Sequence, residues 1–98
     1  MAKKTDKTET AVVVTTEHRG VFFGYTKDVT KRPLTLERMR MCIYWSADVK
    51  GVFGLCATGP NRTCKVGPAV PSSDLEKVTS VTTVTDEAAA NWEKGFWG

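Results

Sequence analysis

The sequence has few of the residues that catalytic and metal centres need. It holds a single histidine, His18, and three cysteines, none of them in a C-x-x-C pair. A structural zinc site needs about four thiolate or imidazole ligands at close spacing, so none is expected. His18 stands between Glu17 and Arg19 in a short polar segment, which is typical of a surface turn. The sequence therefore predicts no catalytic residue, no metal site and no cofactor, and a protein that is not an enzyme.

Long hydrophobic runs are also absent. No apolar run approaches the roughly 18 residues that span a bilayer, and the chain starts with a segment rich in lysine and threonine. We therefore expect no secretory signal, no membrane span and a cytoplasmic location in a host cell. Three cysteines cannot form an even disulfide framework, so they are expected to be reduced, with Cys42 and Cys56 in the core.

The charge balance excludes little by its total. Fourteen basic and 11 acidic residues give a net charge of +3, which is too small to predict a nucleic-acid-binding protein. The distribution is uneven, because acidic residues become frequent only after Leu75. The basic residues of the middle segment are Lys27, Lys31, Arg32, Arg38, Arg40 and Lys50. They indicate either a positive face or pocket, or ordinary solvated strand faces.

Composition predicts one small globular domain. Of the 98 residues, 41% are hydrophobic and 26% are charged, which is typical of a folded chain. We expect residues 1–9 to form a flexible tail and residues 10–98 the domain. A domain of this size has a marginal core, so oligomerisation or a ligand is expected to support it.

The first half of the chain predicts β-structure. Residues 10–16 and 21–26 are rich in β-branched and aromatic side chains, and the polar segment between them ends in Gly20. Together they predict a hairpin. Gly24, inside the second run, indicates a bulge or a close approach of two backbones.

Residues 34–45 predict a further strand, although their leucine, glutamate, arginine and methionine content also favours a helix. The apolar positions change parity at Glu37-Arg38, which indicates a bulge or a break. We expect the following side chains on the core face after that point: Met39, Met41, Ile43 and Trp45. The opposite, non-core face would carry Arg38, Arg40, Cys42 and Tyr44.

The second half predicts a loop, a strand and a helix. Glycine and proline dominate residues 51–71, which predicts a long and largely irregular connection, with a short helix or packed loop at 52–57. Residues 75–84 predict one long strand. Thr85 is a candidate N-cap for a helix over 87–94. The predicted fold is mainly β or α+β, a single small antiparallel β-domain with one or two short helices.

The long connection is the best candidate for a binding site. Glycine-rich turns offer backbone N–H groups, and the guanidinium of Arg62 has the geometry to bind phosphate oxygens. Aromatic side chains near it would add a surface on which a base can stack. Those candidates are Phe22, Phe23, Tyr25, Tyr44 and Phe53, and core packing is the alternative role for each of them.

In order and spacing, several short pieces resemble a family of uncharacterised phage and prophage proteins that carry a domain of unknown function. The pieces are Val13-Val14, residues 20–24, Leu34 to Arg38, residues 43–45, Leu55 with Gly59-Pro60, Cys64-Lys65, Val70-Pro71, and the last strand with its alanine-rich helix. The similarity covers residues 12–97. Met39, Met41 and the segment Ser72-Ser73-Asp74 depart from the pattern without implying another fold.

The size, the β-rich pattern and the phage setting are also similar to the Thoeris anti-defence sponge proteins. This resemblance implies a small oligomer that holds a cyclic ADP-ribose or a cyclic oligonucleotide between subunits without cleaving it. By chemical type, the ligand-binding residues would be Arg19, Arg38, Arg40, Tyr44, Phe53, Asn61, Arg62 and Lys65. Arginines would pair with the pyrophosphate, Phe53 or Tyr44 would stack on adenine, and Asn61 would contact a base edge or a ribose.

The expected function is therefore sequestration of an anionic signal of the cyclic nucleotide class by a phage-encoded homo-oligomer. A small nucleic-acid-binding module that uses the basic middle segment is an alternative. A host-protein interaction module is another, and it predicts an exposed apolar patch around Phe96-Trp97.

Overall fold

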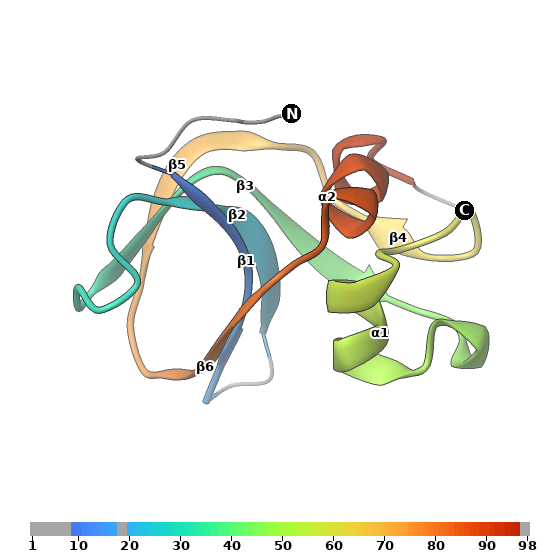
Figure 1. Ribbon diagram of the computed structural model, residues 1–98, viewed down its shortest axis with the longest axis horizontal. Coiled ribbons are helices and arrows are strands. Elements are labelled where there is room, and N and C mark those ends of the chain that lie inside the picture. The colour runs from blue at the N-terminus through green and yellow to red at the C-terminus, as the bar shows by residue number, and fades with distance from the viewer. Residues whose placement is uncertain (1–8, 18–19, 97–98) are drawn as a thin grey trace.

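The structure of the chain is a computed structural model that describes residues 9–17 and 20–96, and it contains a six-stranded antiparallel sheet and two short α-helices (Figure 1). The strands are β1 (Thr10–Thr16), β2 (Val21–Thr26), β3 (Leu34–Tyr44), β4 (Lys65–Val66), β5 (Val70–Leu75) and β6 (Val78–Thr83). The helices are α1 (Gly51–Ala57) and α2 (Asp86–Glu93), preceded by a 3-10 helix, η1 (Ala47–Val49). The predicted fold class is confirmed. Residues 1–8 of the predicted tail lie outside the described residues.

The strand order makes the sheet curl. β6 pairs with β1 at one edge, and β4 and β5 pair with β3 at the other. Only Glu76 and Lys77 separate β5 from β6 in the chain. Because so short a link spans only about 10 Å, the two edges of the sheet must approach each other at this turn. Figure 1 shows the chain passing from β5 round to β6 at the bottom of the view.

The curled sheet has a buried cluster on each face. Inside the curl lie Val12, Val14, Leu34, Leu36, Met39 and Leu75. On the outer face, α1 and α2 cover a second cluster that includes Val13, Phe23, Cys42, Leu55 and Trp92. Because successive side chains of a strand point to opposite faces, the continuous apolar run 12–14 supplies both clusters.

The first hairpin and both irregularities in the strands are confirmed. β1 and β2 pair antiparallel from Thr10↔Thr26 to Thr15↔Val21. The register between β2 and β3 shifts at Gly24, where an added Cβ would lie 2.8 Å from Cβ of Leu36. The parity change in β3 is a bulge rather than a break, because Arg38 has a φ of 51° within one continuous strand.

The predicted core face of β3 is wrong at Met41 and Ile43, which are 42% and 56% exposed. The cluster inside the curl ends at Met39, because the pairing of β5 with β3 ends at Met39↔Val70. Beyond this point no part of the described chain buries that face of β3. Cys42 lies on the opposite face of β3, as predicted, and is buried beneath the helices, which confirms the expected core cysteine and corrects the description of that face as non-core.

The predictions for the second half need two corrections. The short helix offered as an alternative at 52–57 is confirmed as α1, but the rest of residues 51–71 is not an irregular connection, because it contains β4 and the start of β5. The predicted strand 75–84 is two strands, separated at Lys77, whose φ of 55° interrupts the extended backbone. Glycine and proline content misled the first prediction, since Gly54 allows α1 to pack closely: an added Cβ would lie 1.6 Å from the carbonyl oxygen of Val49.

The C-terminal helix forms as its sequence predicts. The Thr85 hydroxyl accepts a hydrogen bond from the Ala88 N–H at 3.0 Å, and Asp86 and Glu87 occupy the first turn, where the helix dipole favours negative charge. Trp92 is fully buried, its ring is stacked on Phe23 and its Nε1 donates to the carbonyl of Leu55 at 3.0 Å. Neither helix in the described ranges is long and apolar enough to cross a membrane.

Candidate functional site

The side chains predicted to bind a ligand do not converge on one place. Arg19 lies outside the described residues. Arg38 and Arg40 are in the middle of β3, and Phe53 projects from α1 with 76% of its surface exposed. The remaining predicted residues lie near the far end of β3: Tyr44, Asn61, Arg62 and Lys65.

Arg40 links three segments of the fold through hydrogen bonds of its guanidinium. Its Nη1 donates to the carbonyl of Gly67 at 3.0 Å and its Nη2 to the carbonyl of Glu93 at 3.4 Å. These contacts join β3 to the segment after β4 and to the end of α2. Its Nε is buried without a hydrogen-bond partner among the described residues. A guanidinium engaged in this way has little capacity left for a ligand.

Asn61 belongs to a polar cluster around η1. Its Nδ2 donates to Asp48 at 3.0 Å, and its Oδ1 accepts from the backbone N–H of Thr63 at 3.0 Å. Ser46 contacts Asp48 and Thr63, and its hydrogen bond lowers the pKa of the Asp48 carboxyl. Both ends of the Asn61 amide are thus used within the chain, whereas Arg62 is exposed and Lys65 lies opposite Tyr44 on β3.

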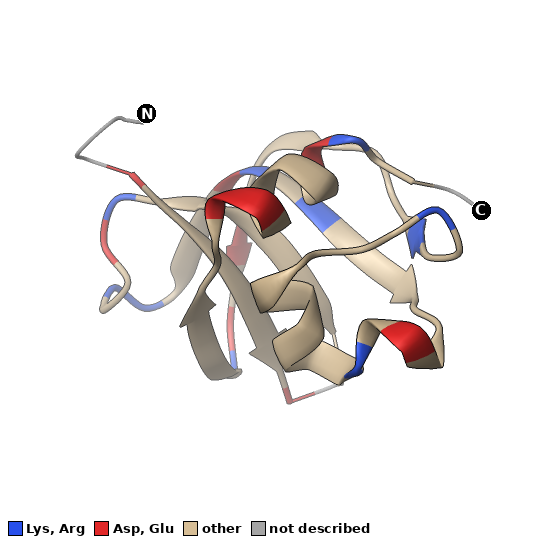
Figure 2. Cartoon of the chain, turned by 45° about the vertical axis from the view of Figure 1, so that its right-hand side comes forward, with Lys and Arg blue, Asp and Glu red and all other residues tan. Residues whose placement is uncertain are grey.

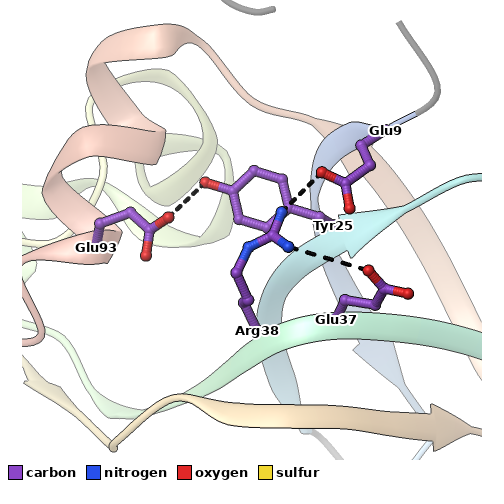
Figure 3. A network of polar contacts seen from close by, with 5 residues as sticks. All are labelled: Glu9, Tyr25, Glu37, Arg38 and Glu93. Carbon is purple, nitrogen blue, oxygen red and sulfur yellow. Dashed lines mark hydrogen bonds and ion pairs between the residues drawn. The ribbon is translucent and has the colours of Figure 1, made fainter. Parts of the chain in front are cut away.

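Arg38 takes part in a different arrangement, which is shown in Figure 3. Its Nη2 binds the Glu9 carboxylate at 2.8 Å, and its Nη1 lies 4.0 Å from Glu37. The guanidinium carbon is 4.2 Å from the centre of the Tyr25 ring, which is a cation–π contact. The hydrogen bond that Arg38 donates to the Glu9 carboxylate is the main cause that raises the pKa of the guanidinium. We call the four residues Glu9, Tyr25, Glu37 and Arg38 the Arg38–Tyr25 platform.

Tyr25, the aromatic member of the platform, is held in place by two contacts of its own. Its hydroxyl donates to the Glu93 carboxylate on α2 at 2.7 Å, and its ring packs edge-on against Phe23. Burial is the main cause that raises the pKa of the Tyr25 hydroxyl, and the Glu93 carboxylate raises it further. The hydroxyl therefore stays protonated and holds the ring in place. The platform joins residue 9, two strands and the C-terminal helix.

Two cavities flank the loop between β2 and β3, residues 27–33. A cavity of about 160 Å³ adjoins the platform and shares Tyr25 and Glu37 with it. Its other lining residues are Thr26, Lys27, Asp28, Lys31 and Thr35. A second cavity of about 530 Å³ lies between the same loop and the β5–β6 turn, lined by Arg32, Pro33, Glu76, Lys77 and Val78. None of the seven described residues of the predicted set lines either cavity.

One protein family matches most of the chain. The family described as Domain of unknown function (DUF6948) matches residues 9–92, from the platform glutamate to the buried tryptophan of α2. The chain belongs to this family. The resemblance to a family with a domain of unknown function is confirmed at that level. No curated protein and no solved structure matches the chain.

Charge in this DUF6948 domain is divided into small patches. In the view of Figure 2, Lys and Arg positions alternate with Asp and Glu positions over the surface. Arg38 lies between Glu9 and Glu37, and the basic loop 27–33 includes Asp28. Over residues 9–17 and 20–96, no group of three or more His, Cys, Asp and Glu side chains is placed to hold a metal ion.

Sequence reasoning missed several residues of these sites in the DUF6948 chain. Glu9 was assigned to the tail, although it directly precedes the first strand. Tyr25 was considered only as one aromatic among several, and its partner Arg38 reaches it because of the bulge that the parity change indicated. Arg32 belongs to the basic middle segment named above, but no sequence pattern pairs it with Lys77, since the two meet only when the sheet curls.

Proposed function

We propose that this chain is a non-catalytic binding protein for an anionic small molecule, and that the Arg38–Tyr25 platform receives the anion. The observation that carries the proposal is the Glu9 carboxylate on the Arg38 guanidinium at 2.8 Å. Glu9 occupies the position that a carboxylate or phosphate of a ligand would take. The chain's own carboxylate thus competes with the ligand.

Three features of the platform support this function. The Arg38 side chain is 48% exposed, so an external anion can approach it. Its φ of 51° is unusual for a non-glycine residue, and such strain occurs most often at functional sites. The adjoining cavity of about 160 Å³ adds Lys27 and Lys31, whose ammonium groups would bind further anionic oxygens.

The finer form of the proposal concerns the ligand and the source. In this form, the chain is a phage-encoded anti-defence sponge that holds a cyclic ADP-ribose or a cyclic oligonucleotide in the cytoplasm of the host cell without cleaving it. The phosphates of the ligand would bind Arg38. The resemblance to such proteins supports this form. It needs no catalytic residue, since release returns the ligand unchanged.

The test is a calorimetric titration of the full chain with cyclic ADP-ribose and with inorganic pyrophosphate. Glu9→Gln removes the competing carboxylate and should tighten binding up to about fivefold, since exposed ion pairs contribute up to about 1 kcal/mol. Arg38→Gln should abolish binding. Glu37→Gln is the matched control, because that carboxylate is also near Arg38 but 4.0 Å away.

Equal binding by the wild type and Arg38→Gln would refute the site. Recovery of intact cyclic ADP-ribose after heat release would support sequestration, whereas recovery of a hydrolysed product would refute it. If pyrophosphate binds and the cyclic nucleotide does not, the anion site stands and the finer form fails.

An interaction module is a second candidate, favoured by one observation. Met41, Ile43 and Val70 are exposed apolar side chains at neighbouring positions of β3 and β5. Phe96, where the sequence predicts such a patch, is half-buried, and Trp97 lies outside the described residues. Homo-oligomerisation through β3 and β5 would cover this surface, and light scattering of the intact chain measures it.

A further inference from the structure

The larger cavity lies where the two edges of the curled sheet meet. Its volume is about 530 Å³, within the range of small-molecule sites, and such sites occur often at the mouths of curled sheets. The β2–β3 loop contributes Arg32 and Pro33, and the β5–β6 turn contributes Glu76, Lys77 and Val78. Val78 also packs against the cluster inside the curl, so the floor of the cavity is apolar.

Lys77 is held in a conformation that favours glycine. Its φ is 55°, in the left-handed region, and its carbonyl accepts a hydrogen bond from the backbone N–H of Glu17 at 2.9 Å. The turn is thereby anchored to the end of β1. A glycine would fit this backbone with less strain.

Arg32 is positioned by its own loop. Its Nη1 donates to the carbonyls of Val29 at 2.8 Å and Lys31 at 2.7 Å. These acceptors are neutral, so they orient the guanidinium without cancelling its charge. In the described part of the chain, no ion pair involves Arg32 or Lys77, in contrast to Arg38. Two cations therefore border one cavity, and the loop carbonyls orient the guanidinium of Arg32.

We propose that this cavity binds a small monocarboxylate with an apolar body. The carboxylate lies between Arg32 and Lys77, where the guanidinium can bind both oxygens. The apolar body lies on Pro33 and Val78. Glu76, on the same rim, repels a second negative charge, so a monoanion is favoured over a phosphate dianion. This site shares no residue with the Arg38–Tyr25 platform and does not depend on the function proposed for it.

The test is an NMR titration of the full chain with hexanoate and, in a separate arm, with inorganic phosphate. Lys77→Gly removes the ammonium and relieves the positive φ, so the fold is retained. We expect hexanoate binding at least about tenfold weaker in this variant, the loss typical of a hydrogen bond to a charged group. Lys50→Gly is the matched control, because Lys50 also has a positive φ, 72°, and lies outside the cavity.

The expected result is that hexanoate shifts the signals of residues 32–33 and 76–78, binds Lys50→Gly as it binds the wild type, and binds more tightly than phosphate. Equal affinity in Lys77→Gly and Lys50→Gly would overturn the proposal, as would the absence of hexanoate binding to the wild type. Phosphate binding as tight as hexanoate binding would overturn the preference for a monoanion. The hexanoate affinity measured from the signals of residues 32–33 and 76–78 should be unchanged in Glu9→Gln, which separates this site from the platform.

Discussion

The two ends of the curled sheet differ in whether their polar side chains are hydrogen-bonded within the chain or border cavities. The helical end, made of η1, α1, β4 and α2, satisfies its polar groups internally: Asn91 donates to the carbonyl of Thr58 at 2.7 Å, and Thr85 to that of Ala57 at 2.6 Å. The open end, made of residues 27–33 and the Glu76–Lys77 turn, carries the two cavities described above. Figure 1 shows the helices gathered on one side and this loop on the other.

This difference separates stability from binding. Trp92 is buried at the helical end and Asn91 is hydrogen-bonded there, so substitutions of such side chains are expected to destabilise the chain. At the open end, Lys27, Lys31 and Arg32 are exposed, and substitutions there are expected to change ligand affinity instead. Because glycine and proline are frequent in residues 51–71, the sequence predicted a binding loop at the helical end. The two cavities lie instead at the open end.

The largest effect is expected from Trp92→Ala at the helical end. The variant loses the ring stacked on Phe23 at 5.2 Å and the hydrogen bond to Leu55, and leaves a cavity. The free energy of unfolding should fall by about 3–5 kcal/mol, measured by guanidinium denaturation. Lys31→Ala at the open end is the control and should change it by less than about 0.5 kcal/mol. Similar losses in both variants would contradict the separation.

A smaller effect should distinguish the two arginines of β3. Arg40→Ala removes the donors to Gly67 and Glu93 and should cost about 1–3 kcal/mol, as for hydrogen bonds to charged groups. Arg38→Ala breaks an exposed ion pair and should cost less than about 1 kcal/mol. Thermal unfolding of both variants measures the difference. If Arg38→Ala is the more destabilising, the platform is a structural contact rather than a site.

The smallest effect is expected from alkaline pH. Burial, with a further contribution from Cys64, raises the pKa of the Cys42 thiol from 9.0 to about 11. Below pH 9.0 the thiol is protonated in both states, so its contribution to stability is complete. As the pH rises from 9.0 to about 11, the unfolded chain loses this proton first, and stability falls. Cys42→Ala should show a weaker dependence of its denaturation midpoint on pH over that range, and an unchanged one would contradict the assignment.

The local features of the fold could be read from the sequence because their causes are local. β-branched runs predicted the first hairpin, Thr85 predicted the start of the last helix within one residue, and the parity change at Glu37-Arg38 predicted the bulge. The exposure of Met41 and Ile43 could not be read in this way. It depends on where β5 stops covering β3, and those strands are far apart in the sequence.

The candidate sites were harder to predict from the sequence than the fold was. Residue types singled out the arginines as candidates, but Arg38 and Arg40 are only two positions apart and have different partners. One binds a carboxylate at the surface, and the other binds carbonyls of segments that fold beneath it. No local pattern distinguishes them, because each role is set by its partners.

The sequence by itself determined the fold class, a small antiparallel β-domain, and the positions of most strands. Hydrophobic alternation, turn chemistry and helix capping act over a few residues, so a linear pattern records them. Only the tertiary structure decided that Glu9 meets Arg38 and that Arg32 and Lys77 face one cavity. The physical reason is the curl of the sheet, which depends on the pairing of strands at long range and on a two-residue link between its opposite edges.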